Sequence, residues 1–124
     1  GPSLSAEVRG YRYRIALAGI AAPEDLPAIG ERIGRFLEAE SFSITRESKG
    51  KTVVKDIRPF VTDLRLDREA HEIVLSAAFG PQGTVRPQDI LTGVCGIAAE
   101  RARTARIQKT GTIFAGAKNF SQTS

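Results

Sequence analysis

The chain of 124 residues holds one cysteine and one histidine, the side chains that most often act as nucleophiles or metal ligands. Cys95 lies on or beside the apolar face of an expected helix, and His71 lies in a polar turn, so nothing links them as a catalytic pair. One residue of each kind cannot provide a zinc-binding spacing. We expect that this fragment binds no metal and no cofactor. We also expect that His71 is a turn residue and that Cys95 packs as a small hydrophobic side chain.

Basic residues are concentrated between Phe42 and Pro59, where only Glu47 and Asp56 oppose them. Lys49-Gly50 separates two apolar runs in this segment and predicts a β-hairpin with cations at its tip. Lysine and arginine side chains of such a hairpin could contact phosphates. The alternative is an edge hairpin that carries lysine to prevent aggregation between sheets.

Asp56 and Arg58 stand two residues apart, so on a strand their side chains point the same way and can pair. Pro59 keeps Arg58 extended. Two interpretations stay open: the carboxylate steers the arginine toward a ligand, or the pair fixes the exit of the hairpin. A third use, Asp56 as acid or nucleophile, is disfavoured because a carboxylate beside arginine has a low pKa.

The net charge of +4 and the pI near 9.6 favour polyanionic partners. Acidic residues gather in the segment 24–40, whereas the segment 101–118 carries only basic charges. We therefore expect a positive side on the molecule, although surface solubility alone explains mild charge polarity. The residues predicted to contact nucleic acid are Arg46, Lys49, Lys51, Arg58, Arg86, Arg106 and Lys109.

Hydrophobic periodicity predicts the elements that position these residues. Strands are expected over 11–17, in a hairpin over 42–57 and in a second hairpin over 60–79; helices are expected over 23–37 and 86–97. A last strand over 103–108 should turn at Thr110-Gly111 into a short return. This order predicts an α+β fold: a ferredoxin-like antiparallel sheet with two helices on one face and an inserted β-hairpin.

We expect a single domain over residues 11–116, with a tag remnant and linker over 1–10 and a flexible tail over 117–124. The Gly1-Pro2 start and the lack of methionine are typical of an excised fragment. A single cysteine fits a reducing cytoplasm, and no run is long and apolar enough to cross a bilayer. We thus expect a cytoplasmic protein with no membrane partner.

Several of these motifs resemble the radical-SAM-linked proteins, a bacterial domain of unknown function found beside or fused to cobalamin-binding radical S-adenosylmethionine (SAM) enzymes. The similarity is to the C-terminal half of that family. It is carried by Pro2-Ser3-Leu4 leading into Tyr11-Arg12-Tyr13-Arg14, Arg46 to Lys51, Asp56-Ile57-Arg58-Pro59, Gly83 to Pro87 with Ile90-Leu91, and Arg106 to Gly111. The resemblance implies an accessory domain whose radical chemistry belongs to a fused or separate radical SAM module.

Two functions from different classes remain open. In the first, the chain is a non-catalytic module that docks RNA, such as ribosomal or transfer RNA, for a partner radical SAM enzyme. In the second, it is a protein-interaction domain that docks on that enzyme and touches no nucleic acid. Tyr11 and Tyr13 are expected to share the core face with Ile15, which counts against sequence-specific base recognition.

Overall fold

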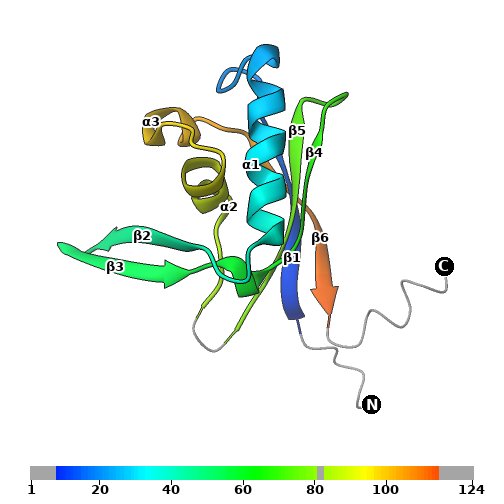
Figure 1. Ribbon diagram of the computed structural model, residues 1–124. Helices are drawn as coiled ribbons and strands as arrows, with labels where there is room; N and C mark the ends of the chain where they lie inside the picture. Colours follow the sequence, from blue (N-terminus) through cyan, green and yellow to red (C-terminus); the bar gives the residue numbers. More distant parts are fainter. Residues whose placement is uncertain (1–7, 81–82, 115–124) are drawn as a thin grey trace.

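Four antiparallel strands form the main sheet of the computed structural model, which describes residues 8–80 and 83–114. The strands are β1 (Val8–Ala16), β4 (Val61–Asp67), β5 (Glu72–Ala78) and β6 (Ile107–Phe114), in the spatial order β4-β5-β1-β6. Both chain-end strands thus lie side by side (Figure 1). With helices after β1 and β5, this is the ferredoxin-like arrangement, and the predicted fold class is confirmed.

Helix α1 (Leu26–Glu38) covers one face of this sheet, after a short 3₁₀ turn η2 (Pro23–Asp25). Its apolar residues recur at helical spacing and are buried: Leu26, Ile29, Ile33 and Phe36. They pack on the inward-facing strand residues Ile15, Leu64, Ile73 and Leu75 in one continuous core. The alternation read in the sequence therefore marks the buried face correctly.

The second helical region differs from the single helix expected over 86–97. It begins as one turn, α2 (Pro87–Asp89), widens into the π-helical turn η4 (Ile90–Val94), and is followed by a separate short helix α3 (Ala99–Ala102). The N–H of Cys95 donates to the carbonyl of Ile90, five residues earlier, and Gly96 then ends the turn at φ +73°. Gly93 permits close packing here, since a Cβ atom on it would lie 2.7 Å from Ile44.

Strands β2 (Ser43–Ser48) and β3 (Lys51–Asp56) form a separate two-stranded sheet, which we call the arm. The turn residues Lys49 and Gly50 both have positive φ, 51° and 79°, as the predicted hairpin turn requires. The arm projects away from the main sheet (Figure 1). The 3₁₀ turn η3 (Arg58–Phe60) then leads from the arm into β4.

The last strand was predicted over 103–108, but β6 spans Ile107–Phe114, so only Ile107 and Gln108 of the predicted strand belong to it. Thr110-Gly111 forms no turn: β6 runs through both residues, and a bulge at this point lets Arg12 face Gly111 while Tyr13 faces Lys109. The first strand begins at Val8, three residues before the predicted domain start. The rest of the predicted linker and the predicted tail over 117–124 lie outside the described residues.

Within residues 8–80 and 83–114, no helix is long and apolar enough to span a membrane.

Candidate nucleic-acid interface

The cations of the arm fall into two groups. Lys49 and Lys51 lie exposed at its tip, where the turn places them. Arg46 instead turns toward α2, where its guanidinium pairs with the carboxylate of Asp89 and donates to the carbonyl of Thr84 at 3.2 Å. Of the predicted binding residues in β2 and β3, Arg46 is therefore already neutralised within the protein.

Arg58 holds the base of the arm together. Its guanidinium donates to three backbone carbonyls, those of Leu37, Ala39 and Val61, each at 3.1 Å. The same group lies 5.1 Å from the centre of the Phe36 ring. These contacts join the end of α1 to the start of β4, so the arginine is turned inward.

The predicted pairing of Asp56 with Arg58 needs a correction. The carboxylate of Asp56 accepts the backbone N–H of Arg58 at 3.1 Å and the backbone N–H of Phe42 at 2.8 Å, and the guanidinium goes to the carbonyls instead. The chain turns into a 3₁₀ helix at Arg58, so the two side chains do not keep the parallel direction of a strand. Of the two interpretations, the geometry agrees with the one that fixes the hairpin's exit.

The other predicted cations are spread around the molecule. Arg86 is exposed at the start of α2, with its backbone N–H bonded to Asp89. Arg106 lies before β6, beside a cavity of about 460 Å³ that Arg14 and Glu72 also line. Lys109 lies on β6 itself, on the opposite side of the molecule from the arm (Figure 1). The predicted cations thus do not converge on one face.

A different grouping forms around Lys109. Its Nζ atom lies 3.5 Å from the centre of the Tyr11 ring, and Tyr11 meets Phe79 edge to face with ring centres 5.2 Å apart. Phe79 is 39% exposed, and Tyr11 is half-buried. Tyr13 adds a further edge-to-face contact, 6.4 Å from Tyr11. A cation stacked on a ring beside an exposed ring is a combination suited to nucleobases.

A second lysine and ring lie next to this group. Phe60 packs against Gly80, the neighbour of Phe79: a Cβ atom on Gly80 would lie 2.9 Å from its ring. Lys55 lies 4.9 Å from the centre of the Phe60 ring and donates to the carbonyl of Thr84 at 3.1 Å. Burial and then the charge of Arg46 lower the pKa of Lys55.

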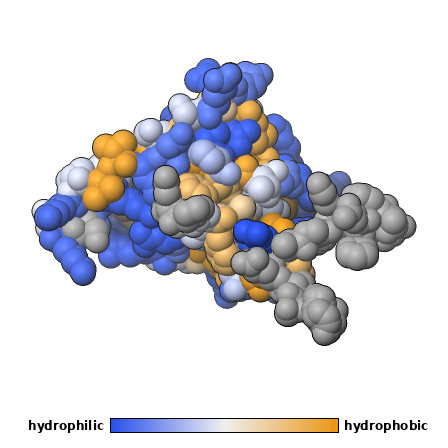
Figure 2. Space-filling view, turned by 90° about the horizontal axis from the view of Figure 1, so that it is seen from below, coloured by the Kyte–Doolittle hydropathy of each residue, from blue (hydrophilic) through white to orange (hydrophobic). Residues whose placement is uncertain are grey.

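We call these two groups together the aromatic strip: Lys109, Tyr11 and Phe79 form the first, and Phe60 and Lys55 form the second, beside Gly80, which follows Phe79 in the chain. Its members lie on β6, on β1, directly after β5, on η3 and on β3, respectively. Figure 2 views the molecule from below and shows hydrophobic side chains at its centre with hydrophilic ones around them. A second, smaller hydrophobic patch lies to the left of the centre in the same view (Figure 2).

Sequence reasoning missed most of the strip. Tyr13 does pack against the core as expected, but Tyr11 lies outside the core cluster, because it is one strand repeat closer to the end of the sheet. Tyr11 lies two residues before Tyr13, which packs against the core, and Phe79 lies two residues after the buried Ala77. This spacing places both rings just beyond the core, and it is the signal that could have found them.

Catalytic alternatives gain no support from the described part of the chain, where no three histidine, cysteine, aspartate or glutamate side chains gather as a metal site. Cys95 is buried, and burial raises the pKa of its thiol to about 12. His71 lies in the turn before β5, with φ 58°, and its Nε2 atom lies 3.0 Å from the carbonyl oxygen of Ala21. The expected turn role of His71 is confirmed.

The fold and the strip define an α+β domain of the ferredoxin-like arrangement with an added hairpin. Residues 1–87 match the model of a family described as an uncharacterized protein conserved in bacteria, DUF2344, and the chain belongs to this family. No curated protein and no solved structure matches the chain. Four members of the strip, Tyr11, Lys55, Phe60 and Phe79, lie within the matched segment, and Lys109 lies beyond it.

Proposed function

We propose that the chain is a non-catalytic accessory domain that docks single-stranded RNA on the aromatic strip, for chemistry done by a partner enzyme. The observation that carries the proposal is the stacking of Lys109 on Tyr11 beside the exposed ring of Phe79. Unpaired bases stack on aromatic faces, and lysine charges beside those faces attract the phosphates that connect them. A duplex hides its base faces, so the strip suits unpaired segments.

Because the other cations are spread around the molecule, a local binding site is favoured and a broad positive face is not. Arg46 and Arg58 make their contacts inside the protein, with Asp89 and with backbone carbonyls respectively. Phosphate contacts in this proposal are therefore few, and stacking supplies much of the affinity. Binding should depend moderately on salt and little on base sequence.

The partner in this proposal is a radical SAM enzyme, fused or separate, working in the cytoplasm. The resemblance carried by Asp56-Ile57-Arg58-Pro59 and the other quoted motifs supports this choice. The low reactivity expected of the buried Cys95 agrees with an accessory role for the described residues.

The test is binding of a fluorescently labelled oligouridine, measured by anisotropy at several salt concentrations. We expect Phe79→Ala to weaken binding by about tenfold, as removal of one stacked base contact does. Lys109→Gln should weaken binding and reduce the slope of log affinity against log salt by about 0.7, the value for one phosphate on a single strand.

Arg103→Gln is the matched control, since it removes a cation that is also exposed but lies between α3 and β6, outside the strip. Its affinity should stay close to that of the unchanged protein. Absence of oligouridine binding at low salt, or equal effects of Lys109→Gln and Arg103→Gln, would contradict the proposal.

One observation favours the second function, docking on a partner protein. Val53 and Val54 on β3 are 49% and 68% exposed, on an arm whose strands pair only with each other among the described residues. A two-stranded hairpin is marginally stable alone, and exposed apolar side chains on it suit a protein surface. Loss of co-purification with the radical SAM enzyme on Val54→Asp, with oligouridine binding unchanged, would assign this role to the arm.

A further inference from the structure

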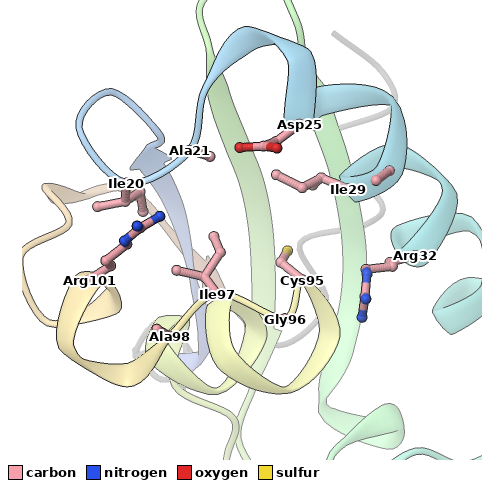
Figure 3. Close-up of a pocket in the computed structure, with 11 residues that line it drawn as sticks. Ile20, Ala21, Asp25, Ile29, Arg32, Cys95, Gly96, Ile97, Ala98 and Arg101 are labelled. Carbon is pink, nitrogen blue, oxygen red and sulfur yellow. The ribbon is translucent and has the colours of Figure 1, made fainter.

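A cleft of about 450 Å³ lies beside the first turns of α1 (Figure 3), and no residue of the aromatic strip lines it. Two stretches far apart in sequence form it: residues 20–32, which run from the loop after β1 into α1, and residues 95–101, which run from Cys95 into α3. Its volume is that of an ordinary small-molecule site. The residues that line it and enter the argument are Ile20, Asp25, Ala28, Ile29, Arg32, Ile97 and Arg101.

The π-helical turn creates one wall of the cleft. The bond from the Cys95 N–H to the Ile90 carbonyl and the positive φ of Gly96 turn the chain, so that Ile97 donates back to Leu91 and its side chain faces α1. Arg32 packs over this turn, since a Cβ atom on Gly96 would lie 3.0 Å from its Nη1 atom. A regular helix through Gly96 would remove this wall.

The floor of the cleft is apolar. Ile29 on α1 and Ile20 after β1 are both 3% exposed and face the side chain of Ile97. The sulfur of Cys95 also points into the cleft, and its raised pKa, about 12 through burial, keeps the thiol neutral. The floor can therefore accept a hydrocarbon group but offers no charge.

The rim carries three charges, one negative on Asp25 and two positive on Arg32 and Arg101. In Figure 3, Asp25 lies above the mouth, with Arg101 to its left and Arg32 to its right. Asp25 and Arg101 also line a second, adjoining cavity. No ion pair joins them, and neither has another ion-pair partner within the part of the chain that is described. One oxygen of Asp25, Oδ2, accepts the N–H of Ala22 at 2.9 Å, which holds the carboxylate in place and leaves Oδ1 for a ligand.

From this arrangement we infer that the cleft binds a small zwitterion with an apolar body, of the amino-acid class. The ligand's ammonium group pairs with Asp25, its carboxylate pairs with Arg101, and its hydrocarbon side chain lies on Ile20, Ile29 and Ile97. A purely cationic ligand would meet both Arg101 and Arg32, and a purely anionic one would meet the charge of Asp25 and leave its Oδ1 atom without a partner. A zwitterion offers a partner to the rim charges of both signs.

The test is isothermal titration of the protein with leucine, isoleucine, valine and phenylalanine, together with amide chemical-shift mapping. We expect at least one of them to bind with a Kd on the order of 1 mM or tighter and to shift amide signals around Ile20, Ile97 and Arg101. N-acetylleucine and leucinamide each lack one charge, and each should bind at least about tenfold more weakly than leucine.

Asp25→Asn and Arg101→Gln should each weaken amino-acid binding by about tenfold or more, and Ala28→Leu should abolish it by filling the cleft. The control Glu31→Gln changes an exposed acid on the same helix whose partner is Arg35, and it should bind normally. If none of the four amino acids binds, or if N-acetylleucine binds as well as leucine, the inference is wrong. Oligouridine binding is a separate readout at the strip and should not change in these variants.

Discussion

The carboxylate of Asp89 pairs with the guanidinium of Arg46 across 43 residues of sequence, and this contact ties the arm to the second helical region. Both side chains are largely buried, at 11% and 19% exposure. The same Asp89 oxygen accepts the N–H of Arg86 at 2.8 Å and so also caps the start of α2. One side chain therefore sets both where the helix begins and how the arm leaves the body.

Asp89→Ala should lower the free energy of unfolding by about 3 kcal/mol, because it leaves a largely buried arginine unpaired and removes a helix cap. The measurement is the midpoint and slope of a urea unfolding curve. Asp63→Ala is the control, since its partner Arg65 is 63% exposed and the surface pair should contribute less than about 1 kcal/mol. Equal losses in both variants would show that Asp89 has no special role.

Acid should lower the free energy of unfolding through protonation of Asp67 at the end of β4. Hydrogen bonds from the backbone of Ala70 and then from Arg14 hold the pKa of Asp67 below its ordinary value. The stabilisation is present above the unfolded-state pKa and is lost as the pH falls below about 4 through the folded-state pKa. Asp67→Asn should flatten the acid side of a stability-against-pH curve, whereas an unchanged curve would contradict the assignment.

Two glycines should respond oppositely to alanine. A Cβ atom on Gly10 would lie 2.1 Å from the carbonyl oxygen of Ala77, so Gly10→Ala must displace β1 from β5 and should cost about 2 kcal/mol or more. Gly34 lies exposed in α1 with nothing within 4 Å of such an atom, and Gly34→Ala should stabilise the protein by about 0.5 to 1 kcal/mol. Thermal unfolding of the two variants measures the direction of each change in stability. A lower unfolding temperature for Gly34→Ala would contradict the prediction.

Cys95 should be inert in the folded protein. Its pKa of about 12, against an ordinary value of 9.0, reduces the thiolate present near neutral pH by about a thousandfold. Alkylation by iodoacetamide should therefore be at least that much slower in the native protein than in urea, as mass spectrometry can follow. Rapid labelling without unfolding would mean that the thiol is open to solvent and ionised.

The sequence by itself determined the order of elements and their inward faces. The alternation from Tyr13 through Ile15, the helical spacing from Leu26 to Phe36 and the Lys49-Gly50 turn depend on neighbours along the chain, so local patterns were enough to predict them. The same patterns led to the four-stranded sheet with its inserted hairpin.

Only the tertiary structure decided which side chains meet. The inward turn of Arg58 depends on carbonyls of α1 and β4, and the bulge in β6 depends on its register against β1. Tyr11 and Lys109 stack because two strands nearly a hundred residues apart lie side by side. Such contacts follow from packing between distant segments, which periodicity along one segment does not specify.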